Sequence, residues 1–464
     1  MFIGREKELE RLASFYSSDF FDIAVIYGRR RIGKSFLLRN FSQDKRTIFF
    51  QATTDKKNNL DELGALVSFV YGTTNPILYH DYAEVFSEIG NLAKTDKLLF
   101  IIDELSFLTE SDKSVLSVLQ KFCDNPFQDT KLKLILCSSY SSFMEERVIS
   151  GSSPLFGRTT LRLKLQGITT EESSAFFPKW ELKEIAMAHV ISGGVPYYLK
   201  RISRYESFDE AVHEEFFSMG GALLNEPILL LYTWARNTNI YFNMISAIAS
   251  GITNTAKIAS KLNIEPAQAS AMLKTLTSYD IVAKKENAVI GGRKATWRIK
   301  DNFFAFWASF VFPAMANIEI DNSDAAFKIA IENLPQFTGK HIEEDIRKYI
   351  IRHSDRLIME YGSAEFPNPQ EKTNEELDFI AKCENETYLF GKFKWRNRET
   401  GIHVLDDLKR KSILAVSRDV KREYYICSES GFSDELIELA SKDKTIHLIE
   451  GDELFGMAKH RISC

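Results

Sequence analysis

The sequence predicts an α/β multidomain protein: a parallel sheet covered by helices, then helical segments, then a second α/β domain. Between residues 21 and 166, short apolar runs rich in β-formers alternate with longer helical stretches, a pattern typical of a parallel sheet buried on both faces. The predicted strands are the runs DIAVIYG, RTIFFQA, LLFIIDE, LKLILCSS and LRLKLQG. From residue 169 to 236 helical periodicity replaces the strands, and after residue 337 helices and strands mix again.

Length and composition agree with several folded domains. The chain has 464 residues, of which 44% are hydrophobic, and so many residues exceed what one core usually holds. The formal net charge is -5, so contact with nucleic acid requires a local basic patch. The five cysteines form no CxxC pair, which argues against a disulfide framework or a zinc site. A charged N-terminus and a short apolar stretch at 303–318 argue against a secretory signal and a membrane span, so a cytoplasmic location is expected.

The strongest motif is a GxxxxGK[ST] loop that follows the first predicted strand and leads into a helical pattern. Glycines let such a loop wrap around a β-phosphate, and the helix that starts there adds its N-terminal dipole. Lys34 then places a charge on the β- and γ-phosphate oxygens, and the Ser35 hydroxyl binds magnesium. The residues assigned to the nucleotide are Gly28, Arg29, Arg30, Arg31, Ile32, Gly33, Lys34, Ser35 and Phe36.

A pair of carboxylates, Asp103 and Glu104, ends the buried run that starts at Leu98. Two carboxylates at the tip of an apolar strand are costly unless they hold something. We expect Asp103 to join Ser35 in the magnesium shell and Glu104 to polarise the attacking water. The two motifs together predict a P-loop ATPase that binds ATP with Mg2+ and hydrolyses it.

These motifs resemble the prokaryotic AAA+ ATPases often called archaeal ATPases, which are related to STAND-type signalling NTPases. The matching segments are FIGREKEL at residues 2–9, YGRRRIGKS, IIDE, LILCSSYSSFMEE from Leu134, PLFGR ending at Arg158, and GGVPYYL from Gly193. The resemblance implies a P-loop AAA+ sheet with a helical lid. It also implies an adenine pocket that is formed by Phe2, Ile3, Gly4, Arg5 and the lid segment around Pro196.

Two further roles are implied by the same resemblance. A polar sensor of the γ-phosphate is expected after the Leu134–Leu136 run, at Ser138 or Ser139, with Ser138 as the first candidate. The family usually carries a Gly-Ser arrangement there, whereas Cys137 precedes the two serines in this chain. Arg158 resembles the family's arginine near the γ-phosphate, acting in cis or in trans between subunits of a homo-oligomer. A surface arginine that ends a loop is the alternative.

Residues 237–302 are predicted to form a winged helix-turn-helix. A helix over 254–263 precedes a tight turn and a second helix that starts at Pro266, and two strands around Gly291-Gly292 follow. The basic residues of this wing are Lys284, Lys285, Arg293, Lys294, Arg298 and Lys300. Such a concentration in a net-acidic chain indicates phosphate contacts with DNA. A protein-binding module, with lysines that only keep the hairpin edge soluble, is the alternative.

The resemblance extends to residues 337–464, which look like the restriction-endonuclease-like (PD-(D/E)xK) domain that often ends this family. Such sites place carboxylates around a magnesium ion, with a lysine near the attacking water. The carboxylates here are Glu343, Glu376 and Asp378, and Lys394 and Trp395 match the last strand, but Lys392 replaces its glutamate. A cation repels the metal, so we expect a domain that binds and does not cut. An ordinary ion pair of Asp378 with Lys394 is the alternative.

Five segments follow from these motifs: a P-loop ATPase core (1–168), a helical lid (169–236), a winged helix-turn-helix (237–302), a helical connector (303–336) and an inactive nuclease-like domain (337–464). The hypothesis is an AAA+ switch that couples ATP hydrolysis to DNA or partner binding, without a membrane. The alternatives are a signalling scaffold with a nucleotide-occupancy sensor and a protein-binding C-terminal half, and a weak ATP-dependent nuclease.

Overall fold

The computed structural model describes residues 3–235, 237–285, 287–291, 296–368, 371–416 and 419–457. The chain forms two compact units, one of residues 1–167 with 195–197, and one of residues 168–194 with 198–464. The segment expected to be a lid for the ATPase core is therefore grouped with the C-terminal part of the chain. Within the described ranges, no helix combines the length and apolar character that a membrane crossing requires.

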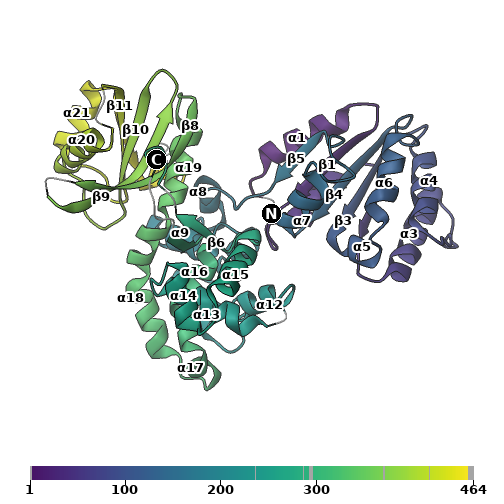
Figure 1. Ribbon diagram of the computed structural model, residues 1–464, viewed down its shortest axis with the longest axis horizontal. Helices are drawn as coiled ribbons and strands as arrows, with labels where there is room; N and C mark the ends of the chain where they lie inside the picture. The colour runs from purple at the N-terminus through teal and green to yellow at the C-terminus, as the bar shows by residue number, and fades with distance from the viewer. Residues whose placement is uncertain are drawn as a thin grey trace. The chain divides into compact units, whose positions relative to one another are not determined.

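The first unit is built on a five-stranded parallel sheet (Figure 1). Its strands, in the order β2-β3-β4-β1-β5, are β1 (Asp22–Tyr27), β2 (Thr47–Gln51), β3 (Leu98–Asp103), β4 (Leu132–Ser138) and β5 (Leu161–Lys164). Every residue of β1, β3 and β4 is buried, as expected for a parallel sheet with both faces covered. All five predicted strands are thus present, and their carboxyl ends meet at one edge of the sheet.

The helices of the first unit carry the apolar faces that cover this sheet. They are α1 (Glu6–Ser17), α2 (Lys34–Ser42), α3 (Lys56–Tyr71), α4 (Tyr82–Leu92), α5 (Leu105–Ser111), α6 (Val115–Asp124) and α7 (Ser141–Phe143). Alternate strand residues such as Val25, Phe100 and Leu134 share one core with α3, α4 and α6, which lie together on one side of β3 and β4 in Figure 1. This core fixes the strand ends that carry the predicted motifs.

The second unit begins with helices and continues into a helix-turn-helix with a hairpin. The elements are α8 (Thr170–Ser173), α9 (Leu182–Ser192), α10 (Pro196–Ile202), α11 (Phe208–Val212), α12 (Glu226–Tyr232), α13 (Thr238–Ala249), α14 (Thr255–Leu262), α15 (Pro266–Ser278), β6 (Val282–Lys285) and β7 (Thr296–Ile299). The Asn254 side chain caps α14 by accepting from the Ala256 and Lys257 N–H groups. Pro266 opens α15, whose apolar face is buried as predicted.

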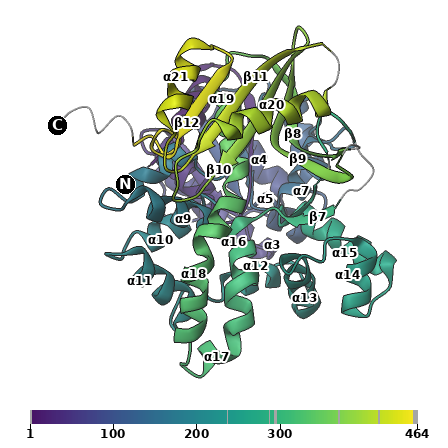
Figure 2. The ribbon, with the colours of Figure 1, turned by 90° about the vertical axis from the view of Figure 1, so that its left-hand side faces the viewer.

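The aromatic stretch after the hairpin forms a buried chain of short helices. It comprises α16 (Asn302–Phe306), a short π-helix at Trp307–Val311, a 3-10 helix at Phe312–Ala314 and α17 (Met315–Glu319). Pro313 lacks an N–H donor, so the helical pattern changes beside it. The next helix, α18 (Asp324–His341), continues across residue 336 (Figure 2), so the expected boundary between connector and final domain falls inside a helix.

The C-terminal part contains a five-stranded mixed sheet flanked by helices. Its elements are α19 (Glu343–His353), β8 (Ile358–Asn368), β9 (Thr373–Cys383), β10 (Thr387–Lys394), α20 (His403–Ala415), β11 (Lys421–Ser428), α21 (Asp434–Lys442), β12 (Ile446–Glu450) and α22 (Gly451–Leu454). The strand order is β12-β11-β10-β9-β8, antiparallel from β8 to β10 and parallel from β10 to β12. Figure 2 shows α20 and α21 beside this sheet.

Candidate active site

The loop between β1 and α2 has the backbone that its glycines require. Gly28 has φ of 150° and Gly33 has φ of 92°, values that side-chain-bearing residues rarely adopt. A Cβ at Gly28 would lie only 2.6 Å from the Leu165 carbonyl oxygen. Lys34 is the first residue of α2, so the loop ends at a helix N-terminus. Strand, glycine turn and helix therefore follow one another as the motif predicts.

Lys34 is buried beneath this loop. Its Nζ donates to the carbonyl oxygens of Gly28 at 2.9 Å and of Arg29 at 3.0 Å. Burial lowers the pKa of Lys34, while the charges of Glu104 and Asp103 oppose that shift. The ammonium therefore lies within electrostatic reach of the acidic tip of β3. Such a group binds an anion strongly because little water screens it.

The two predicted magnesium ligands contact each other directly. Ser35 Oγ donates to Asp103 Oδ2 at 2.6 Å, although 68 positions separate the two residues along the chain. Asp103 is 1% exposed, and its Oδ1 accepts from the Glu104 N–H at 3.1 Å. The hydroxyl of the glycine loop and the carboxylate of β3 are thus brought to one point.

Glu104 is held by Ser139, the second of the two residues expected to sense the γ-phosphate. Ser139 donates its hydroxyl to Glu104 Oε1 at 2.6 Å and its N–H to Oε2 at 3.2 Å. Ser138 is fully buried, and its hydroxyl instead bonds to Ser106 Oγ at 3.1 Å. Of the two sensor candidates, the structure therefore places Ser139, and not Ser138, on the Glu104 carboxylate. The sequence feature that pointed to Ser139 was its position immediately after β4, at the sheet edge where β3 also ends.

The N-terminal box is clamped to the same loop. Phe2 lies outside the described residues, and Ile3 is partly buried. Gly4 and Arg5 both have positive φ, 70° and 75°, which turns the chain into α1. The Arg5 guanidinium donates to the carbonyl oxygens of Ile32, at 3.2 Å, and of Gln166. The box therefore contacts the backbone of the glycine loop.

The segment 195–197, which includes the first two residues of α10, belongs to the first unit although the residues on either side of it do not. The Arg31 guanidinium lies 4.2 Å from the centre of the Tyr197 ring, a distance typical of a cation–π contact. The structure thus brings Pro196, the N-terminal box and the glycine loop into one unit. Phe36, which follows Ser35 on α2, is 57% exposed.

Arg158 lies at the opposite edge of the sheet. It precedes β5, which starts beside Ile23 at the first residues of β1, and the Thr160 N–H donates to the Ile23 carbonyl. Its guanidinium donates to Asp124 Oδ2 at 2.9 Å and to the Pro154 carbonyl at 2.9 Å. The six residues of β1 separate this edge from Gly28 by about 17 Å. In this structure Arg158 is therefore paired away from the glycine loop, and its role, in cis or in trans, stays a prediction.

In the C-terminal domain, lysine and arginine side chains form ion pairs with the carboxylates that were expected to surround a metal ion. Lys392 Nζ lies 2.7 Å from Asp378 Oδ1, and the Phe393 N–H donates to Oδ2 at 2.8 Å. Arg347 pairs with Glu343 at 2.6 Å, and burial raises the pKa of Glu343. The alternative ion pair of Asp378 with Lys394 is wrong, because Lys392 occupies that position. In the described part of the chain, no group of three or more acidic, His or Cys side chains is arranged to hold a metal.

Three of the four described basic residues of the hairpin pair with carboxylates of the same chain. Lys285 pairs with Glu376 at 3.0 Å, Arg298 with Glu344 at 3.9 Å and Lys300 with Asp280 at 2.6 Å. Lys284 lies 5.6 Å from the centre of the Trp297 ring, and Arg293 and Lys294 lie outside the described residues. Three of the four described cations are therefore paired with carboxylates, and contact of the hairpin with phosphates stays a prediction.

The hairpin loop also docks on the edge strand β8. The Asn287 amide donates to the Glu365 carbonyl at 2.7 Å and accepts from its N–H at 2.9 Å. The Ala288 N–H donates to the Ser363 carbonyl at 3.1 Å. A Cβ at Gly362 would come within 2.7 Å of the Ala288 methyl group, so glycine permits this close approach. The loop thus extends the sheet edge by backbone pairing.

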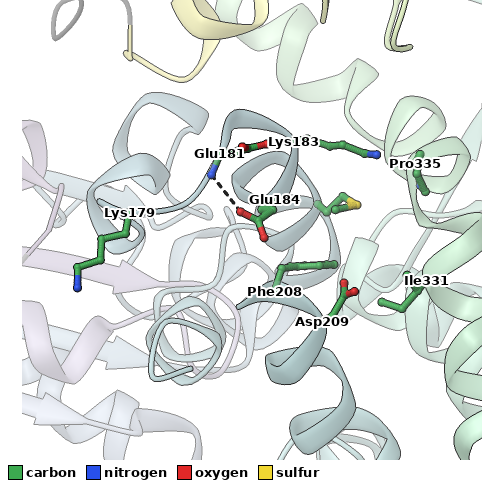
Figure 3. A pocket seen from close by; sticks show the side chains of 9 residues that line it. Lys179, Glu181, Lys183, Glu184, Phe208, Asp209, Ile331 and Pro335 are labelled. Carbon is green, nitrogen blue, oxygen red and sulfur yellow. Dashed lines mark hydrogen bonds between the residues drawn. The ribbon is translucent and has the colours of Figure 1, made fainter. Parts of the chain in front are cut away.

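A hollow of about 590 Å³ lies between α9, α11 and α18 (Figure 3). Lysines and carboxylates both line it, among them Lys179, Lys183 and Asp209. Figure 3 shows the Glu184 carboxylate turned toward the Glu181 N–H, its partner at 3.0 Å in the cap of α9. Charges of both signs line the hollow, and Glu184 is engaged in capping α9. The hollow therefore lacks the convergent phosphate-binding groups of the glycine loop.

A parallel sheet with a glycine loop, a buried lysine and a paired serine and aspartate at its carboxyl edge defines a P-loop ATPase. The family model of the ATPase domain predominantly from Archaea matches residues 2–202. A second model, described as archaeal and bacterial proteins of unknown function, matches residues 307–409. Residues 2–202 are therefore similar to the archaeal ATPase domain, and this part of the chain is a P-loop ATPase domain.

Three similar proteins illustrate this relationship. An uncharacterized protein of Methanocaldococcus jannaschii is 29% identical over 92% of this chain and 95% of its own length. An uncharacterized ATP-binding protein of the same organism is 37% identical over 10% of this chain and 78% of its own length. The solved structure of a Walker-type ATPase of Pyrococcus abyssi has a TM-score of 0.52 at 20% identity, covering 66% of this chain and 96% of that one. The last likeness concerns the fold alone.

Proposed function

We propose that this ATPase binds magnesium–ATP with Lys34, Ser35 and Asp103, and that Glu104 activates the attacking water. The observation that carries this proposal is the 2.6 Å hydrogen bond from Ser35 Oγ to Asp103 Oδ2. Hydroxyl and carboxylate oxygens are ligands that Mg2+ prefers, and Mg2+ commonly takes only one or two protein ligands beside phosphates and water. The residues present therefore fit the ion.

Each side chain then has a separate task. Lys34, held by two loop carbonyls, meets the terminal phosphates with a poorly hydrated charge. When bound, magnesium neutralises the charge that develops on the phosphate oxygens. Glu104, fixed by two donors from Ser139, takes the proton of the water. Arg158 is proposed to act only in trans, on the nucleotide of a second copy, since its own loop is at the far sheet edge.

We also propose that the nucleotide state is coupled to DNA binding by the second unit. The exposed side of α15, with Gln268, Ala271 and Lys274, suits a recognition helix of a helix-turn-helix. Lys285, Arg298 and Lys300 of the hairpin are less suited, because they are paired with carboxylates. Nuclease activity is not proposed, because Lys392 holds the Asp378 carboxylate. A protein-binding second unit is the other candidate, favoured by the neutralised hairpin.

The test is the ATPase rate of the full chain with and without duplex and single-stranded DNA across a salt series. Stimulation by DNA that falls steeply with salt is expected, since phosphate contacts release counterions. A rate that DNA leaves unchanged at every salt concentration contradicts the coupling. Stimulation by a protein partner without salt-sensitive DNA binding supports the other candidate.

A further inference from the structure

In a second basic segment of the chain, three of four cations form no ion pair with any described residue. Residues 392–398 read KFKWRNR, with a cation at every second position and no carboxylate. The basic strip is defined as Lys392, Lys394, Arg396 and Arg398. It starts on β10 and runs past its carboxyl end, and Lys392 and Lys394 share one face of the strand because side chains alternate.

The charges of this strip are not balanced locally. Lys392 is paired with Asp378. Lys394 is partly buried, whereas Arg396 and Arg398 are exposed, and the side chains of these three form no hydrogen bond or ion pair with any described residue. Burial and the neighbouring Lys392 and Arg396 lower the pKa of Lys394, and the nearby Asp378 carboxylate opposes that shift. Three cations without a carboxylate partner, in a chain of formal net charge -5, form a local positive field that attracts polyanions.

The backbone beneath the strip is fixed. The Lys394 carbonyl accepts from the Glu429 N–H at 3.1 Å, and the Thr400 N–H donates to the Gly431 carbonyl at 3.0 Å. Ser430 Oγ donates to the Arg396 carbonyl at 3.1 Å. The strip therefore has a preset path along the end of β11, which reduces the entropy lost when a ligand binds.

We propose that the basic strip binds the phosphate backbone of a nucleic acid without a metal ion, and this rests on the proposed DNA coupling. Repeated phosphates match repeated cations, and guanidinium groups hold phosphate oxygens bidentately. Trp395, partly exposed between two of the cations, adds an aromatic face of the kind that stacks on bases. No metal is required, because the Lys392 ammonium satisfies Asp378 and Lys394, Arg396 and Arg398 supply the positive charge.

The experiment measures binding of the full chain to a labelled 20-mer, single-stranded and duplex, across a salt series in EDTA and in Mg2+. The double variant Arg396→Ala/Arg398→Ala changes exposed residues only, so folding is preserved. We expect its affinity to fall at least tenfold and its salt slope to drop by about 2, one for each lost phosphate contact. Lys442→Ala/Lys444→Ala removes the same charge from exposed positions of the same part of the chain and is expected to leave both quantities unchanged.

Several outcomes overturn the inference. Equal salt slopes for the double variant and the wild type place the contact elsewhere, and binding abolished by EDTA shows that a metal carries it. Equally tight binding of polyglutamate indicates an acidic protein ligand instead. Full DNA stimulation of ATP turnover in the double variant refutes nucleic-acid binding by the basic strip and leaves the proposed coupling intact. Strip-dependent binding that fails to stimulate turnover refutes the coupling and leaves the strip intact.

Discussion

Replacing Glu104 by glutamine separates ATP binding from ATP hydrolysis. The change keeps the shape of the side chain and removes its charge and its ability to take a proton. In the structure, Ser139 donates to both carboxylate oxygens, at 2.6 and 3.2 Å. The amide of glutamine keeps one acceptor, so one of these two donors loses its partner. The ligands of the nucleotide, Lys34 and Ser35, are untouched.

The expected magnitude follows from these contacts. Loss of a general base costs about 10²- to 10⁴-fold in rate, which is about 3–5 kcal/mol in the activation barrier. The lost hydrogen bond to a charged group costs roughly 1.5–3 kcal/mol, and its loss leaves the side chain less firmly positioned. We therefore expect the turnover number of Glu104→Gln to fall at least about 100-fold, while ATP affinity stays within about threefold because Lys34 still meets the phosphates.

The assay combines steady-state phosphate release with equilibrium binding of a fluorescent ATP analogue. Glu110→Gln is the matched control, because Glu110 lies on the same helix, α5, and is exposed; its turnover and affinity are expected to equal those of the wild type. Turnover of Glu104→Gln within threefold of the wild type would show that another group activates the water. A parallel loss of ATP affinity would show that Glu104 binds the nucleotide and does not act as the base.

Three further predictions concern the loop, the glutamate and the pH dependence. Lys34→Ala should weaken ATP binding about 100-fold, since it removes a charged hydrogen-bond donor; unchanged affinity in a titration refutes the phosphate-loop assignment. Ser139→Ala should lower turnover about tenfold at constant ATP affinity, since only one of two donors to Glu104 is lost, and a wild-type rate contradicts the positioning role. Burial lowers the pKa of His341 from 6.5 to about 4. As the pH falls, this histidine is therefore protonated at a higher pH in the unfolded chain than in the folded one. The free energy of unfolding should then fall by about 3 kcal/mol from pH 6.5 to 4, which denaturant titrations measure. The same fall in the variant His341→Gln would show that other groups cause the pH dependence.

Local sequence patterns predicted the elements that are buried throughout or along one regular face. The strands β1, β3 and β4 of the first sheet are mostly apolar and fully buried, and the capping of α14 by Asn254 and the start of α15 at Pro266 follow from short-range chemistry. Strand β8 was not predicted, because most of its first residues are exposed and the usual alternation appears only from Ala364 onward. Its pairing with β9 and with the hairpin loop supplies the stability that its own sequence lacks.

The sequence by itself determined the phosphate loop, the acidic strand tip and the class of enzyme. Those features depend on residues within one turn or one strand, where spacing along the chain sets the geometry. The tertiary structure decided which charged groups are available for binding. Carboxylates far away along the chain, such as Glu376 for Lys285, neutralise the hairpin, while Lys394, Arg396 and Arg398 have no such partner among the described residues. Charge pairing depends on distances in space, and a linear pattern of basic residues does not contain those distances.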